Sequence, residues 1–260
     1  MTPEGRAGLT AVRSDPSRAL VVLDYDGTLA PVVADPGRAH PAPGAVAALR
    51  QLQVGRLAVV TGRAADVAVR LGGLDAVPSL VVLGQYGAQR WEAGHLSSAG
   101  VPPGLAEAAA ELARLLCGTG AALEDKGLSL SVHTRGAADP AGLLAALSGP
   151  VAEIARRAGL SVHPGRLVLE VRPAGFDKGQ AVLTLAEPAP GAVCVVGDDV
   201  GDAPMYDAVR ELRARGVPGV TVFADSAEGP AALRDAADLV VPGPDGVVAF
   251  LQTLAQAAPA

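Results

Sequence analysis

Short apolar runs alternate along much of the chain with segments whose apolar residues recur at helical spacing. The runs are rich in Val, Leu and Ala and lie at 19–24, 56–60, 80–83, 192–196 and 220–223. The helical segments lie at 43–53, 64–71, 177–186 and 203–215. Strands of a parallel sheet have such a composition, because helices cover both faces of the sheet. The pattern therefore predicts an α/β fold built on a parallel sheet.

A different pattern occupies the middle of the chain. Short strands are expected to pair as hairpins at 122–133 and 160–171, and helices are expected at 103–116 and 140–158. Gly149-Pro150 is expected to break the second helix, since proline removes a backbone donor and clashes with the preceding turn. Hairpins together with two helices are typical of an α+β unit.

The domain organisation follows from this change of pattern. We predict a core domain formed by residues 1–95 and 173–260, interrupted by an inserted domain at 96–172. Residues 1–18 are polar and are expected to form a loose or loosely helical lead-in. A terminal helix that starts at Gly246 is expected to complete the core.

The composition agrees with aliphatic layers between a sheet and its helices. Half of the 260 residues are hydrophobic but only 3% are aromatic, and the net charge is -6. The negative charge argues against a nucleic-acid partner or an anionic membrane surface. No apolar run approaches the roughly 18 residues that span a bilayer, and no secretory signal pattern opens the chain. We therefore expect no membrane partner and a cytoplasmic location by default, and a monomer is compatible with the sequence.

Cysteine and lysine are both scarce in this chain. Cys117 and Cys194 lie far apart in apolar surroundings, so we expect two buried thiols and neither a disulfide nor a metal motif. Of 21 basic residues only Lys126 and Lys178 are lysines. Because an ammonium and a guanidinium are not interchangeable, these two positions either have a chemical reason or are left by chance.

Carboxylates stand directly after the first predicted strand. Asp24 ends the run at 19–24, and Asp26 lies two residues further on, directly before Gly27. An Asp-rich turn would account for Asp26-Gly27, but it would leave Asp24 without a purpose. Two carboxylates held close together are costly unless a cation or a reaction uses them.

Further polar clusters follow other predicted strands or begin a helix. They comprise Thr61, Lys178 and the carboxylates Asp198, Asp199 and Asp202. The carboxyl ends of parallel strands lie along one edge of a sheet, so these residues can converge with the first pair. Together they supply oxygen ligands suited to Mg²⁺, a positive charge, a hydroxyl and a nucleophile. This inventory fits phosphoryl transfer, which consists mostly of positioning and charge neutralisation.

Four of these motifs resemble those of the haloacid dehalogenase-like phosphatases. They are Asp24-Tyr25-Asp26-Gly27-Thr28, Thr61-Gly62, Lys178 and Gly197-Asp198-Asp199. The resemblance implies a Rossmann-like parallel-sheet core with an inserted α+β cap domain that closes over a small substrate.

The same resemblance implies a role for each matched residue. Asp24 would be the nucleophile that forms an aspartyl-phosphate, and Asp26 would be the general acid and base. Thr61 would bind a phosphoryl oxygen, and Lys178 would neutralise its charge. Mg²⁺ would be held by Asp24, the backbone carbonyl of Asp26 and Asp198, with Asp199 and Asp202 supporting the metal site.

Finer features are similar to the trehalose-6-phosphate phosphatases. They are Asp26-Gly27-Thr28-Leu29-Ala30-Pro31, Thr61-Gly62-Arg63, Gly84-Gln85-Tyr86-Gly87, Glu124-Asp125-Lys126-Gly127, His133-Thr134-Arg135 and Glu170-Val171-Arg172-Pro173. This resemblance implies that Glu124, Lys126 and Glu170 bind the distal glucose. Arg135 would help to hold the phosphate end when the cap closes. Gly62 and Arg63 are further candidate substrate-binding residues, and an arginine beside Thr61 is well placed for phosphate. Both lysines of the chain therefore fall on matched positions.

Some positions depart from the family pattern and leave the exact sugar open. Gly201 replaces a threonine, Ala203-Pro204 replaces an acidic pair, and Gln85-Tyr86 replaces Asn-His. The leading hypothesis is a Mg²⁺-dependent hydrolase of trehalose 6-phosphate in trehalose biosynthesis. The alternatives are phosphatases for sucrose phosphate, mannosylglycerate-type or hexose phosphates, a phosphotransferase, and a catalytically silent sugar-phosphate sensor. Glu124 and Lys126 could also belong to an ordinary solvated turn.

Overall fold

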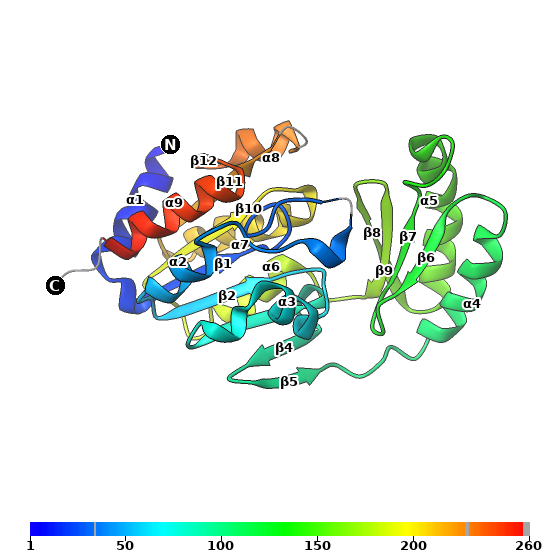
Figure 1. The fold of residues 1–260 in the computed structure, drawn as a ribbon, viewed down its shortest axis with the longest axis horizontal. Coiled ribbons are helices and arrows are strands. Elements are labelled where there is room, and N and C mark those ends of the chain that lie inside the picture. Colours follow the sequence, from blue (N-terminus) through cyan, green and yellow to red (C-terminus); the bar gives the residue numbers. More distant parts are fainter. Residues whose placement is uncertain (34, 227–228, 257–260) are drawn as a thin grey trace. The chain divides into compact units, whose positions relative to one another are not determined.

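The computed structural model of the chain describes residues 1–33, 35–226 and 229–256. The chain forms two compact units (Figure 1). The first comprises Met1–Ser97 and Asp177–Ala260, and the second, drawn mostly in green, comprises Ser98–Phe176. Among the described residues, no helix is both long enough and apolar enough to cross a membrane.

An eight-stranded sheet lies at the centre of the described part of the first unit, in the order β12-β11-β10-β1-β2-β3-β4-β5. Its strands are β1 (Ala19–Leu23), β2 (Arg56–Val60), β3 (Leu80–Gly84), β4 (Gln89–Glu92), β5 (His95–Ser98), β10 (Ala192–Gly197), β11 (Gly219–Asp225) and β12 (Leu239–Pro242). The strands from β12 to β3 in this order run parallel, and β4 pairs antiparallel with β3. The predicted α/β class with a parallel-sheet core is confirmed.

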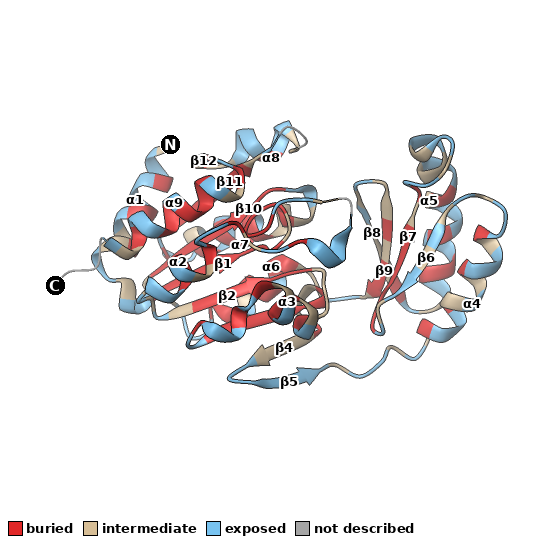
Figure 2. Cartoon of the chain, viewed as in Figure 1, coloured by how far each residue is buried: buried red, intermediate tan, exposed pale blue. Residues whose placement is uncertain are grey.

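Helices cover both faces of this sheet. They are α1 (Pro3–Ser14), α2 (Ala45–Gln51), α3 (Ala65–Gly72), α6 (Lys178–Leu185), α7 (Ala203–Ala214), α8 (Ala231–Ala236) and α9 (Gly243–Gln256). Val21 and Leu23 pack with residues of α1, α2, α3 and α9, whereas Leu20 and Val22 pack with residues of α6 and α7. Successive side chains of β1 therefore enter two different cores, and β1 and β10 are buried throughout (Figure 2).

The amino-terminal lead-in is better ordered than the sequence suggested. Its residues form α1, in which Thr2 caps the first turn by accepting a hydrogen bond from the Gly5 amide. Leu9 and Val12 are buried in the core. Gly8 lies so close to β11 that a β-carbon there would be 1.8 Å from the Gly219 carbonyl oxygen. Helix α1 is thus an integral layer of the first unit.

The carboxylate of Asp238 ties three elements of the first unit together. It accepts hydrogen bonds from Thr2 at the start of α1, from Arg213 of α7, and from the amide and hydroxyl of Thr221 on β11. Burial favours the protonated form, but these hydrogen bonds outweigh it and lower the pKa of Asp238. The ionised carboxylate therefore stabilises the fold.

Asp238→Asn should lower the free energy of unfolding at neutral pH by about 1.5–3 kcal/mol, because hydrogen bonds to a buried charged group are lost. A lowered folded-state pKa gives stability that is present above the unfolded pKa of about 3.9 and is lost as pH falls through the folded value. Urea unfolding at neutral pH and at about pH 3 measures both stabilities, with the exposed Asp235→Asn as the control. A gap between Asp238→Asn and the unsubstituted chain that persists unchanged at low pH would contradict this account.

The second unit contains an antiparallel sheet in the order β6-β7-β9-β8. Its strands are β6 (Ala122–Asp125), β7 (Leu130–His133), β8 (Leu160–Gly165) and β9 (Val168–Pro173), and its helices are α4 (Leu105–Leu116) and α5 (Pro140–Arg157). Leu130, Val132, Leu169 and Val171 pack with residues of both helices. The alternate side chains of these strands lie on the other face of the sheet.

Two expectations about local structure were wrong. Helix α5 runs through Pro150 without ending, so Gly149-Pro150 does not break it. Val151, Ile154 and Ala155 beyond the proline are buried in the second unit, and this packing outweighs the cost of the proline. Of the two cysteines, Cys194 is buried but Cys117 is exposed at the end of α4.

Candidate active site

The carboxyl edge of the central strands brings three polar residues of the sequence together. Strand β1 lies between β10 and β2, and Leu23 is level with Val196 on one side and Val59 on the other. Asp24, Asp198 and Thr61 follow these three strands and are all buried. The sheet register therefore places the predicted nucleophile, one predicted metal ligand and the predicted phosphate-binding hydroxyl at one edge.

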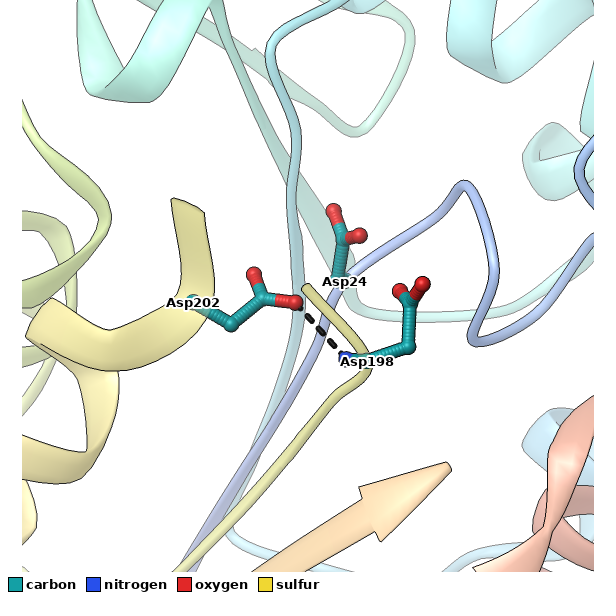
Figure 3. Close-up of side chains that lie close together, drawn as sticks. All are labelled: Asp24, Asp198 and Asp202. Carbon is teal, nitrogen blue, oxygen red and sulfur yellow. Dashed lines mark hydrogen bonds between the residues drawn. The ribbon is translucent and has the colours of Figure 1, made fainter. Parts of the chain in front are cut away.

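Three carboxylates form a buried cluster at this edge (Figure 3). Asp24, Asp198 and Asp202 each offer an oxygen atom, and these atoms lie within 4.8 Å of one another. Among the described residues this is the group that could hold a metal ion. The side chains of Asp26 and Asp199 do not belong to it, and Asp199 is exposed.

Lys178 supplies a buried positive charge to the cluster. It is the first residue of α6, whose amino end is capped by Asp177. The Lys178 Nζ atom lies 2.7 Å from Asp24 Oδ1 and 2.6 Å from Asp202 Oδ1. Burial acts to lower the pKa of Lys178, but Asp202 and Asp24 outweigh it and raise the pKa well above its usual value. The lysine therefore stays charged between its two partners.

Three carboxylates surround the single ammonium group of Lys178, and the pKa values of two of them are raised. Burial, followed by Asp202, raises the pKa of Asp24 well above its usual range, and Lys178 opposes the shift. Burial raises the pKa of Asp198 to about 8, with Asp202 and Asp199 adding to the effect. A further positive charge at this place would stabilise the ionised forms.

Asp202 is engaged on both of its oxygen atoms. Oδ1 pairs with Lys178, while Oδ2 accepts hydrogen bonds from the amides of Asp198 at 2.8 Å and Asp199 at 3.2 Å. This residue closes the one-turn helix η5 (Val200–Asp202) that follows β10. It is fully buried and fixes the positions of Lys178 and Asp198.

The loop after β1 is shaped around Asp198. Gly27 has φ +82°, and a β-carbon there would lie 1.9 Å from Asp198 Oδ2, so only glycine fits. The hydroxyl of Thr28 donates a hydrogen bond of 3.3 Å to Asp198 Oδ1. This contact of Thr28 was not predicted, although the residue lies within the motif that begins at Asp24.

Arg63 binds Asp26 through two parallel hydrogen bonds. Its Nε and Nη2 atoms each lie 2.6 Å from a different oxygen of Asp26, and its Nη1 atom donates to the Pro36 carbonyl at 2.8 Å. The guanidinium also lies over the ring of Tyr25, 5.5 Å from its centre. The arginine predicted to hold phosphate therefore contacts the predicted general acid in this structure.

Charged residues of the second unit form a chain of contacts. Lys126 Nζ lies 3.0 Å from Glu170 Oε1 and 4.0 Å from Glu124 Oε2, and His133 Nε2 lies 2.9 Å from Glu124 Oε2. The predicted sugar-binding residues Glu124, Lys126 and Glu170 are thus close to one another, whereas Arg135 is exposed just beyond β7. The alternation of His133 with the apolar Leu130 and Val132 indicates a structural role, and in the structure its side chain contacts Glu124.

Solved structures share the fold of this chain. The C-terminal domain of trehalose-6-phosphate phosphatase from Candida albicans matches with a TM-score of 0.77 at 21% identity, covering 98% of this chain and 97% of that one. A haloacid dehalogenase-like hydrolase from Bacteroides thetaiotaomicron matches with a TM-score of 0.63 at 17% identity, covering 91% and 99%. The fold is that of the haloacid dehalogenase-like hydrolases.

Sequence comparison narrows this class to one family. The family model described as trehalose-phosphatase matches residues 22–236. The trehalose-phosphate phosphatase of Mycobacterium avium is 38% identical over 215 residues, which cover 76% of this chain and 53% of the relative. That of Mycobacterium bovis is 34% identical over 252 residues, covering 91% and 61%. The chain belongs to the trehalose-phosphatase family, and it spans about half to three fifths of the length of these curated relatives.

Proposed function

We propose that the chain hydrolyses trehalose 6-phosphate to trehalose and phosphate through an aspartyl-phosphate on Asp24. The observation that carries the proposal is the contact of Lys178 with both Asp24 and Asp202, beside Asp198, in a chain of the trehalose-phosphatase family. A carboxylate oriented by a lysine can attack phosphorus while the lysine neutralises negative charge.

The reaction proceeds in two steps. A carboxylate oxygen of Asp24 forms a bond to phosphorus, the bond from phosphorus to the sugar oxygen breaks, and this oxygen takes the proton of Asp26. Asp26 then takes a proton from water, the water oxygen bonds to phosphorus, and the bond to Asp24 breaks. Thr61 binds a phosphoryl oxygen, and Arg63 exchanges its contact with Asp26 for the phosphoryl group. The chain ends the cycle unchanged.

The acidic cluster fits Mg²⁺, which prefers carboxylate oxygens and keeps several waters. Asp24, Asp198 and the backbone carbonyl of Asp26 would hold the ion, with Asp202 fixing Asp198 and Asp199 adding negative charge nearby. The bound ion would supply positive charge that neutralises the phosphoryl oxygens during transfer.

Asp198→Asn tests the metal site through stability. The pKa of Asp198 is raised to about 8 in the folded chain, whereas an unfolded aspartate has a pKa of about 3.9, so this carboxyl group destabilises the metal-free protein at neutral pH. The substitution removes the titrating group and should raise the melting temperature without metal. Mg²⁺ at about 100 times its dissociation constant should stabilise the unsubstituted chain by about 2.7 kcal/mol and stabilise Asp198→Asn much less. Thermal unfolding with and without Mg²⁺ measures both effects, and the exposed Asp75→Asn is the control. An equal Mg²⁺ effect on all three proteins would exclude Asp198 as a ligand.

In the second unit, Glu124, Lys126 and Glu170 recognise the sugar, and Arg135 contributes to binding the phosphate end. Lys126 and Glu170 are only 19% and 12% exposed and already face each other, so sugar hydroxyls would meet an ordered pair of charges. Hydrogen bonds between charged groups and hydroxyls favour a particular sugar, because an analogue lacking the hydroxyl leaves the charged group unpaired.

Lys126→Ala should lower kcat/KM for trehalose 6-phosphate by about ten- to a hundredfold, the effect of losing a charge-assisted hydrogen bond. It should leave the hydrolysis of 4-nitrophenyl phosphate nearly unchanged, since that compound has no sugar. Steady-state kinetics with both substrates gives the comparison, and Lys126→Arg, which retains the charge, is the matched control. Equal losses on the two substrates would remove Lys126 from sugar recognition.

A panel of sugar phosphates tests the proposed function. Phosphate release should be fastest from trehalose 6-phosphate, slower from sucrose, glucose and mannosylglycerate-type phosphates, and suppressed by a chelator. Equal rates on every sugar would contradict the proposed specificity. Tight binding of trehalose 6-phosphate without turnover would instead indicate a sensor.

A further inference from the structure

Two consecutive residues after β3 adopt the left-handed backbone conformation, which residues with a side chain rarely adopt. Gln85 has φ +46° and Tyr86 has φ +60°, within the short turn η4 (Gln85–Gly87). A left-handed backbone is unfavourable for residues with a β-carbon. Such conformations persist where the surrounding structure determines them, and they gather at functional sites. The contacts of Gln85 and Tyr86 should therefore show which part of the molecule holds them in this conformation.

The backbone of the pair is bonded to the turn at residues 61–63. The Gln85 amide donates to the Arg63 carbonyl at 2.7 Å, and the Tyr86 amide donates to the Thr61 carbonyl at 3.0 Å. The Thr61 amide in turn donates to the Leu83 carbonyl at 2.9 Å. Three hydrogen bonds thus join the end of β3 to the 61–63 turn.

The ring of Tyr86 lies against the middle of the same turn. A β-carbon on Gly62 would be 2.6 Å from the Tyr86 Oη atom and 2.8 Å from its Cζ atom. A β-carbon at residue 62 would therefore displace the ring from this place. The ring and the backbone of residue 86 both contact the 61–63 turn, the ring at Gly62 and the amide at Thr61.

The 61–63 turn holds groups whose positions matter for the proposed reaction. The Arg63 amide donates to Thr61 Oγ1 at 3.1 Å, which fixes the oxygen of the hydroxyl and lets its proton be donated to a phosphoryl oxygen. The Arg63 side chain holds Asp26. A displacement of about 1 Å in such a group can cost about a hundredfold in rate.

We propose that Tyr86 is a positioning residue that fixes the 61–63 turn in the shape that binds the phosphoryl group. The proposal rests on the proposed function, because it assigns phosphoryl binding to this turn. It adds a residue outside the predicted catalytic set, and it explains the left-handed pair. In the left-handed conformation, the amide of Tyr86 contacts Thr61 while its ring contacts Gly62.

The test compares binding of inorganic phosphate, with Mg²⁺ present, to the unsubstituted chain, Tyr86→Ala, Tyr86→Phe and Gly62→Ala by calorimetry. We expect Tyr86→Ala and Gly62→Ala to weaken phosphate binding by about tenfold or more, since both separate the ring from the turn. Tyr86→Phe keeps the ring and should restore most of the binding. Thr2→Ala, which loosens the distant start of α1, controls for a general loss of stability.

A double substitution separates positioning from a structural role. In the Tyr86→Ala background, Gly62→Ala no longer meets a ring, so its further loss of phosphate binding should be smaller than its loss in the unsubstituted chain, and the two effects should be less than additive. The same variants should lose kcat/KM equally on trehalose 6-phosphate and 4-nitrophenyl phosphate, in contrast to Lys126→Ala.

Several results would overturn the proposal. These are unchanged phosphate binding in Tyr86→Ala, additive effects in the double variant, the same loss in Thr2→Ala, or no phosphate binding by the unsubstituted chain. Phosphate binding does not depend on which sugar is the substrate. If the chain binds phosphate but does not hydrolyse trehalose 6-phosphate, the proposed function fails. The role of Tyr86 is then still tested by phosphate binding to the variants.

Discussion

Asp24→Asn should abolish phosphate release from trehalose 6-phosphate, with a loss of about four orders of magnitude or more, as when other covalent nucleophiles are removed. The amide cannot form the aspartyl-phosphate, and it also removes one carboxylate from the cluster around Lys178. We expect the fold to persist, because Lys178 keeps its contact with Asp202 and the apolar residues of β1 are unchanged.

Phosphate release and thermal unfolding, measured on the same preparation, check this prediction. Burial and neighbouring carboxylates raise the pKa of Asp24, so a neutral amide there should not lower the melting temperature. The exposed Asp75→Asn serves as the matched control for the loss of one carboxylate. Substantial residual turnover by Asp24→Asn would refute its role as the nucleophile.

Asp26→Asn should lower kcat/KM for trehalose 6-phosphate by about 10²–10⁴, the usual contribution of a positioned general acid or base. The effect should depend on the leaving group. A sugar alkoxide needs a proton as it departs, whereas 4-nitrophenolate is stable without one, so the loss on 4-nitrophenyl phosphate should be much smaller. Since kcat/KM reports the phosphorylation step when that step is irreversible, the ratio of the two losses isolates the acid role.

The contact between Arg63 and Asp26 gives this prediction a control. Arg63→Lys keeps a positive charge but cannot form two parallel hydrogen bonds to the carboxylate. It should affect both substrates, because it disturbs the phosphoryl end without removing the proton donor. If Asp26→Asn loses the same factor on both substrates, Asp26 does not protonate the leaving group.

Much of the core domain could be predicted because its strands and their polar ends are marked by residues that are neighbours in the sequence. The apolar run before Asp24 has to be buried on both faces, and in the structure Leu20 and Val21 enter different cores. The polar residues that follow the strands meet because parallel strands end at a common edge. Lys178 could be singled out because lysine is so scarce in this chain.

What could not be predicted depends on contacts that are remote in the sequence. Helix α1 is polar overall, and its order comes from packing against β11 and from Asp238, more than 200 residues away. The different roles of Asp198 and Asp202 depend on the partners of the two Asp202 oxygen atoms. One binds Lys178 and the other accepts a hydrogen bond from the Asp198 amide. The left-handed backbone of Tyr86 has no sequence signal, because tyrosine does not favour that conformation.

The most direct test of the central claim is a single-turnover experiment with trehalose 6-phosphate carrying a radiolabelled phosphoryl group. Acid quenching at successive times should trap label on the protein, in the peptide that contains Asp24, before labelled phosphate accumulates. The label should be absent from Asp24→Asn. Release of phosphate without any labelled protein, or label that persists in Asp24→Asn, would contradict the account.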